Sequence, residues 1–470
     1  MMMELDLRAK RDTKRWLFLA LFCLAIGGLY ALPLAAGRGL KHVSEAQVQH
    51  IFNIVLAVHV DLSIFLWFLA IILLMWRLIP CMLEAKPALS LPYFQTTSQL
   101  LFGLGALLMA LSPFMGEVEG LRSNYIPMLT SHAFFISLAC IACSLCLGLI
   151  ETLCVVSPVR LLKMAFSRSY IIGPLSAYAA WGCALIVAVA LAAFSVAGQG
   201  VDPTMRGEVY YDRVFWAGGH VIQFAYTQAA MLAWLLVAQA VGLRLPFGNR
   251  FYASLFSINL LAMLYVPIPF MRFSVDSEAF QSSFTQLMIW ANGLSPAILM
   301  LVIVFVVIRQ WRHLLMHRHA SLLCLLSSIL LFCYGGVLAL MIKGQNVVIP
   351  AHYHGSIVGI TLAMMGLVYA LLPKVEWAEA QRWRVAVWQP VVLCAGQIIH
   401  VSALAWSGGY GVLRKTVGTD GYPPEVRVAM GLLGGGSGLA SIGGAMFVIA
   451  VLLAMKHRSK SQLDNLIAKR

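Results

Sequence analysis

The segment Pro350-Ala351-His352-Tyr353-His354-Gly355-Ser356 begins an apolar run that continues to Leu372. An α-helix advances about 100° per residue, so two histidines at positions i and i+2 point to nearly opposite sides of one helix. Such a helix can present His352 to one neighbour and His354 to another. An ionisable side chain within a membrane span is costly and indicates a functional site.

The rest of the chain has the composition of a membrane protein. Its 470 residues are 61% hydrophobic and 11% charged, and its mean hydropathy is +0.84. A soluble protein of this length could not bury so much apolar surface, whereas runs of about twenty apolar residues are typical of transmembrane helices. We therefore expect an all-α, polytopic membrane protein, a single membrane domain over residues 1–470. Its twelve transmembrane helices are expected at about 16–36, 51–78, 98–115, 126–155, 170–197, 212–242, 252–271, 285–309, 320–342, 347–373, 386–407 and 427–456.

The net charge of +14 does not indicate nucleic-acid binding, because of its distribution. With the N-terminus in the cytoplasm, most of the 33 Lys and Arg residues fall in cytoplasmic segments, which is the positive-inside pattern. This predicts a multi-pass protein of the bacterial inner (plasma) membrane with both termini cytoplasmic. The basic segment over residues 8–15 resembles the start of a signal peptide, but no small-residue cleavage site follows, so the first helix is expected to be retained.

The ten cysteines lie nearly all within apolar spans and do not form a disulfide framework. The chain has no Cys-x-x-Cys-His motif, so we expect no covalently attached c-type haem.

Further histidines stand alone in apolar segments, namely His59, His132, His220 and His400. With the orientation given above, the histidines of the second, sixth, tenth and eleventh spans share one layer, about 8–14 Å below the outer boundary. Neutral imidazole is a common ligand of haem and metal ions, and facing helices can hold a planar cofactor between them. We expect a cofactor at the set His59, His220, His352 and His354. Taken singly, His132 or His400 is more typical of a packed, hydrogen-bonded residue.

Several residues near this layer have more than one interpretation. Asp61 could stabilise a cation, serve in a proton path or pair with a nearby donor. Gly218 and Gly219 would let a flat ring or another backbone approach, or simply permit close helix packing. Pro267 and Pro269 are expected to kink or end the seventh span.

The loop after the eleventh span carries two adjacent cations, Arg414 and Lys415. Outer loops of this chain have few positive charges, so the pair suggests an anionic partner above the histidine layer. Haem propionates would fit.

Taken together, the pattern resembles subunit I of the haem-copper oxidase superfamily, which includes cytochrome c oxidases, quinol oxidases and nitric oxide reductases. The resemblance covers most of the chain. It implies two haems, of b-, o- or a-type. His59 and His354 would ligate the low-spin haem, and His352 would be the proximal ligand of the high-spin haem.

The resemblance also implies a distal metal, copper or non-haem iron, with His220 as one of its ligands. Arg414 and Lys415 would hold the haem propionates. Other implied partners are the lipid bilayer, an accessory subunit, and a periplasmic electron donor such as a cytochrome c or a cupredoxin.

The sequence departs from the family at the distal site. Val266-Pro267 stands where the family has adjacent histidines in the seventh span. Phe224 replaces the tyrosine that oxidases have four residues after the span-6 histidine, and the glutamate of nitric oxide reductases is absent. Tyr226 and Tyr265 are candidates for displaced substitutes. One imidazole cannot hold copper or iron tightly, so we expect no stoichiometric distal metal.

The leading hypothesis is an enzyme of the terminal oxidase or nitric oxide reductase type. Electrons would pass from the low-spin to the high-spin haem and reduce O2 or NO, with His352 and His220 at the catalytic site. The alternative is a degenerate, copper-less member that binds or senses a gas or transfers electrons. A transporter would show repeated halves with broken helices, and no clear internal repeat is present.

Overall fold

The computed structural model describes residues 4–36, 45–84, 92–314, 320–344, 346–413 and 423–457. Within these residues, twelve helical stretches are long and apolar enough to cross a membrane, which confirms the expected all-α architecture. In an apolar environment a helix satisfies its own backbone hydrogen bonds, and this explains why each apolar run is helical.

The described residues form two compact units. The first takes those within Met1–Gly27, Asn53–Leu236 and Arg244–Arg309, and the second takes those within Gly28–Phe52, Val237–Leu243 and Gln310–Arg470. The helices that lie wholly or mainly in the first unit are α1 (Leu7–Ala36), α3 (Trp67–Arg77), α4 (Ile79–Met82), α5 (Pro92–Leu111), α6 (His132–Cys154), α7 (Pro158–Ala165), α8 (Ile172–Gly200), α9 (Gly207–Ala240), α10 (Asn249–Ala262), α11 (Pro267–Arg272), α12 (Glu278–Leu287) and α13 (Leu294–Arg309). Those of the second unit are α14 (Trp311–Leu314), α15 (Ala320–Ala339), α16 (Val348–Leu371), α17 (Arg384–Gly409) and α18 (Pro424–Lys456). Helix α2 (Glu45–Val60) is divided between the two units at Asn53.

Short irregular turns interrupt or extend several of these helices. Two are π-helical, η2 (Asp61–Leu66) and η5 (Met288–Asn292), and four are 3-10 turns, η3 (Ser112–Phe114), η4 (Met263–Tyr265), η6 (Leu372–Val375) and η7 (Ala380–Arg382). The seventh span breaks at η4, directly before α11. This confirms the expected kink, because proline cannot donate a backbone hydrogen bond.

One span begins later than expected. The segment predicted from residue 126 becomes helical only at His132. The preceding residues form an antiparallel hairpin, in which β1 (Gly120–Leu121) pairs with β2 (Met128–Leu129). The hairpin lies between α5 and α6.

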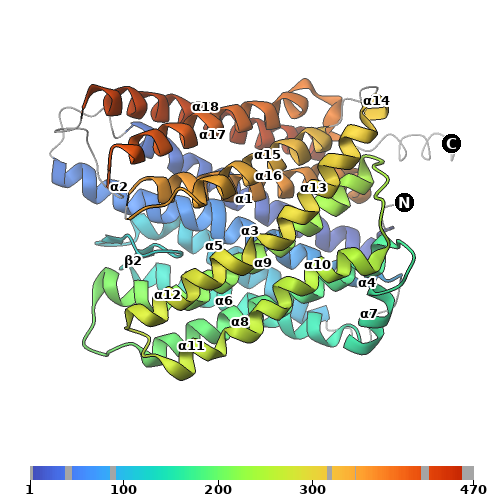
Figure 1. Cartoon of the computed structure of the whole chain (residues 1–470), viewed down its shortest axis with the longest axis horizontal. Helices are drawn as coiled ribbons and strands as arrows, with labels where there is room; N and C mark the ends of the chain where they lie inside the picture. The colour runs from blue at the N-terminus through green and yellow to red at the C-terminus, as the bar shows by residue number, and fades with distance from the viewer. Residues whose placement is uncertain are drawn as a thin grey trace. The chain divides into compact units, whose positions relative to one another are not determined.

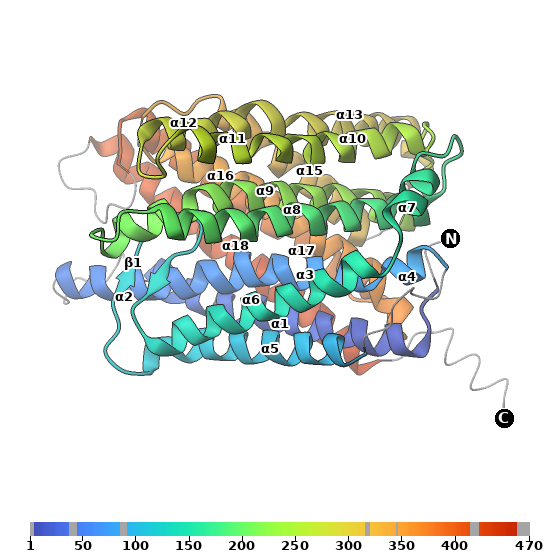
Figure 2. The same ribbon diagram turned by 90° about the horizontal axis from the view of Figure 1, so that it is seen from below.

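Within the first unit, α5 and α6 lie side by side, and so do α10 and α13 (Figure 2). Polar side chains join some of these helices. Ser98 and Ser144 exchange hydrogen bonds between α5 and α6. At one end of the unit, the guanidinium of Arg77 lies 2.9 Å from the buried carboxylate of Asp12.

Within the second unit, α15 packs along α16 and α17 packs along α18 (Figure 1). Both helix pairs approach closely because, at the contact, a glycine of one helix lies against a glycine or the main chain of the other helix. A Cβ added to Gly355 would lie 2.8 Å from the Cα of Gly335, and one added to Gly443 would lie 2.6 Å from the Cα of Leu393. Small residues at such positions let membrane helices approach closely.

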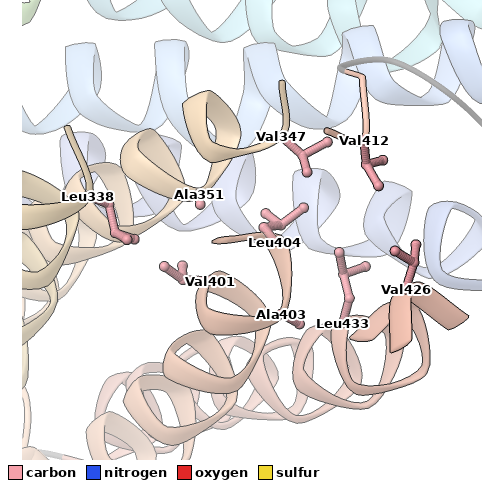
Figure 3. Close-up of a cluster of buried hydrophobic side chains, with 9 residues drawn as sticks. All are labelled: Leu338, Val347, Ala351, Val401, Ala403, Leu404, Val412, Val426 and Leu433. Atoms are coloured by element: carbon pink, nitrogen blue, oxygen red, sulfur yellow. The ribbon is translucent and has the colours of Figure 1, made fainter. Parts of the chain in front are cut away.

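A buried apolar cluster joins α15, α16, α17 and α18 near one end of these helices (Figure 3). It consists of Leu338, Val347, Ala351, Val401, Ala403, Leu404, Val412, Val426 and Leu433. The backbone N–H of Val347 also donates to the carbonyl oxygen of Val412, at 2.9 Å. The cluster fixes the start of α16, where the two paired histidines lie.

Candidate functional site

His59 lies near the end of α2, immediately before the π-helical turn η2. Its Nδ1 atom is 2.8 Å from the carbonyl oxygen of Gly27 on α1. A carbonyl oxygen only accepts hydrogen bonds, so Nδ1 carries the proton and Nε2 keeps its lone pair. The hydroxyl of Ser63 donates to the carbonyl oxygen of His59 at 2.6 Å and supports the irregular turn.

His352 has the same arrangement in the second unit. Its Nδ1 atom is 2.7 Å from the carbonyl oxygen of Gly335 on α15. The proton is therefore again on Nδ1, and the Nε2 lone pair is the one that can bind a metal ion.

His354 contacts a different helix. Its ring centroid is 4.8 Å from that of His400 on α17, with an interplanar angle of 62°. The side-chain amide of Gln397, one turn earlier on α17, donates to the carbonyl oxygen of His354 at 3.3 Å. The two histidines of α16 thus contact different helices, α15 for His352 and α17 for His354.

His220 lies on α9 and is 6% exposed. Its Nδ1 atom is 2.7 Å from the carbonyl oxygen of Trp216, so Nδ1 carries the proton. The hydroxyl of Tyr125 is within hydrogen-bonding distance of both ring nitrogens, 2.8 Å from Nδ1 and 3.0 Å from Nε2. One oxygen this close to both ring nitrogens lies over the face of the imidazole, so the phenol contacts His220 without lying along the lone pair of Nε2.

Tyr125 belongs to the hairpin between α5 and α6 and was not expected at the site. It has a left-handed backbone conformation, with φ of 71°, which is uncommon for a residue other than glycine. Helix α9 holds the hairpin in place, because the backbone N–H of Asn124 donates to the carboxylate of Asp212 at 2.6 Å. No local sequence signal indicates that this loop returns to His220.

The structure gives a specific role to the glycine pair before His220. A side chain at Gly219 would collide with the ring of Tyr125, and one at Gly218 would collide with the ring of Phe194. The flat rings that approach these glycines within the first unit are therefore aromatic side chains of the protein.

The surroundings of His220 do not fit a distal metal. Trp216 and Phe284 are its ring neighbours, with centroids 4.9 Å and 6.2 Å away. Among the described residues, no three His, Cys, Asp or Glu side chains gather as a metal-binding group. Phe224 is fully buried, and Tyr226 packs edge-on against Phe68, with ring centroids 4.9 Å apart.

Other residues singled out in the sequence have varied positions. Asp61 is fully buried at the start of η2, and neither carboxylate oxygen has a hydrogen-bond partner among the described residues. His132 is exposed and is the first residue of α6 and of the fourth candidate span. Arg414 and Lys415 lie outside the described residues. All ten cysteines are free thiols.

The donor set fits haem better than it fits a cluster of metal ligands. Histidines that bind a metal through one nitrogen usually donate the other N–H to a carbonyl or carboxylate, which fixes the tautomer and the ring orientation. His59 and His352 meet this condition with backbone carbonyls. Haem needs only one or two such axial ligands from the protein.

Comparison with known proteins gives a family match across nearly the whole chain. The family model described as Cytochrome C and Quinol oxidase polypeptide I matches residues 12–452. In the fold comparison, a heme-copper terminal oxidase dimer solved by cryo-EM matches with a TM-score of 0.71 at 14% sequence identity. The match covers 96% of this chain and 84% of that chain, which shows a shared fold.

Two sequence relatives also match over most of their length. The uncharacterized protein RP382 of Rickettsia prowazekii (strain Madrid E) is 28% identical over 490 residues, covering 92% of this chain and 94% of the relative. An uncharacterized protein of Aquifex aeolicus (strain VF5) is 25% identical over 381 residues, covering 77% of this chain and 85% of the relative.

Proposed function

Because the chain belongs to the Cytochrome C and Quinol oxidase polypeptide I family, we propose that it is a respiratory membrane oxidoreductase that holds two haems and reduces a small gas, O2 or NO. His59 and His354 are the proposed ligands of a low-spin haem, and His352 is the proposed proximal ligand of a high-spin haem. Bound there, haem iron would supply electron transfer at the first site and gas binding at the second.

The main support for this proposal comes from the hydrogen bonds of His59 and His352. In both His59 and His352, the Nδ1 proton is directed at a backbone carbonyl oxygen of a neighbouring helix. The ring is held in one orientation, and only Nε2 can act as an axial ligand.

The surroundings of His220 favour a role without a distal metal. Copper or iron needs several ligands of suitable geometry, and the ring neighbours of His220 are the aromatic side chains of Tyr125, Trp216 and Phe284. We propose that His220 acts as a hydrogen-bonding residue in the catalytic site, with Tyr125 as its partner.

The same observation favours a second candidate function. A family member without a distal metal could bind a gas or transfer electrons without turnover. Consumption of O2 or NO by the haem-loaded protein, with a reduced small electron donor, separates the two. Turnover supports the enzyme, and gas binding without consumption supports the alternative.

We also propose partners for the haems, a membrane location and an electron donor. Arg414 and Lys415 are the proposed partners of the haem propionates. The protein is proposed to lie in a bacterial inner membrane with both termini cytoplasmic, and to receive electrons from an accessory subunit or from a periplasmic cytochrome c or cupredoxin.

Haem extraction from the purified protein tests the proposal. The pyridine complex of the extracted haem is expected to give two haems per chain, of b-, o- or a-type, all removable by acidified acetone. Absence of haem from protein produced with an adequate haem supply would contradict the proposal.

A further inference from the structure

His400 is a half-buried histidine on α17 that the proposed function does not use. It contacts a residue that the function does use, because its ring meets that of His354 in a T-shaped arrangement with centroids 4.8 Å apart. Both residues belong to the second unit.

The tautomer of His400 follows from its partners. The hydroxyl of Ser437 on α18 donates its single proton to the carbonyl oxygen of Leu433, at 2.8 Å. The same Ser437 oxygen is 2.7 Å from Nδ1 of His400, and the Leu433 carbonyl oxygen is 3.3 Å from it. Since both groups can only accept from the ring, Nδ1 of His400 is the donor. The imidazole is thus fixed in one tautomer and one orientation.

The backbone around His400 leaves little room for movement. A Cβ added to Gly436 would lie 2.6 Å from the backbone nitrogen of His400, so α17 and α18 are in direct contact at this level. One turn earlier on α17, Gln397 donates to the carbonyl oxygen of His354. The same stretch of α17 therefore holds both the backbone and the ring of His354.

We propose that His400 is a positioning residue for His354, and that α18 controls the orientation of this haem ligand through Ser437 and His400. The inference rests on the proposed function, since it takes His354 as a ligand of the low-spin haem. Groups that contact a metal ligand set its ring orientation and tune the metal. A change at Ser437, which is linked to His354 through the ring of His400, should therefore change the properties of the low-spin iron.

Three substitutions separate the parts of this arrangement. His400→Asn keeps a donor near the position of Nδ1 but removes the ring that meets His354. His400→Phe keeps a ring but removes the donor. Ser437→Ala removes only the acceptor. Ser441→Ala is the matched control, because Ser441 lies one turn further along α18, is equally half-buried, and donates only to the carbonyl oxygen of Ser437, at 2.9 Å.

The readouts are the g values of the ferric low-spin haem in electron paramagnetic resonance and the midpoint potential of the same haem. We expect the low-spin signal to shift and broaden in all three variants, most in His400→Asn, with the Ser441→Ala signal unchanged. If the parent protein has a low-spin haem and the variants keep its g values and potential, the positioning role is wrong. An equal shift in Ser441→Ala would also overturn it.

A parent protein without any low-spin haem would instead contradict the proposed function, so the two failures are distinguishable. If His400→Asn loses the fold, Ser437→Ala and His400→Phe still decide the question, because Ser437→Ala removes a single oxygen atom and His400→Phe keeps a ring at this position.

Discussion

The Nδ1 atom of His352 lies 2.7 Å from the carbonyl oxygen of Gly335, on the neighbouring helix α15. This contact depends on the absence of a side chain at Gly335. A Cβ at that position would lie 2.8 Å from the carbonyl oxygen of His352 and would collide with the backbone nitrogen of Ser356. The close contact between the main chain of α15 at Gly335 and the main chain of α16 therefore sets the orientation of His352, the proposed proximal ligand.

The first prediction is that Gly335→Ala separates α15 from α16. The added methyl group cannot be accommodated without a shift of backbone, and overpacking of this kind costs about 1–3 kcal/mol. We expect a lower melting temperature in detergent and a loss of the haem held by His352. Gly336→Ala is the control, because a Cβ at Gly336 meets no atom within 4 Å. Equal behaviour of the two variants would contradict the prediction.

The second prediction concerns the low-spin ligands. His354→Ala or His59→Ala should abolish the low-spin signal and leave a haem that binds CO, because each substitution removes one axial imidazole of the same iron. Optical and electron paramagnetic resonance spectra of the purified variants check this. If both haem signals survived His354→Ala, the assignment would be wrong.

The third prediction concerns Arg414 and Lys415, which lie outside the described residues. Paired cations stabilise ionised carboxylates by charge-assisted hydrogen bonds. Replacing both with Gln should lower the haem content per chain and change the redox potential. A variant with the haem content, spectrum and potential of the parent would rule out the role with propionates.

The fourth prediction is that no stoichiometric copper or non-haem iron accompanies the haems. Val266 and Pro267 supply no ligand, and the ring neighbours of His220 are aromatic side chains. Metal analysis of protein purified without chelators is expected to show haem iron alone. About one copper or one extra iron per two haems would refute the prediction and restore a complete distal site.

The twelve spans could be predicted because each apolar run is long enough to cross a bilayer independently of its neighbours. Local exceptions could not be predicted in this way. The π-helical turn after His59 and the hairpin before His132 depend on packing against other helices. The break before Pro267 was predictable, since proline acts through its own backbone.

For the site, the sequence identified the histidine types and their spacing but not their partners. The contacts of Gly335 with His352 and of His400 with His354 depend on how far one helix is shifted along another. Tyr125 was missed because its contact with His220 joins residues far apart in the chain. The ligand roles themselves came from the family resemblance and stay predictions.

In the proposed function, one chain holds two haems, of which only one has an open position. The most direct test is the optical spectrum of the reduced, purified protein with and without CO, because CO binds only a haem iron that lacks a sixth ligand. We expect about half of the haem to form a CO complex while the low-spin half is unchanged. CO binding by all of the haem, or by none of it, would show that the two irons are not coordinated as proposed.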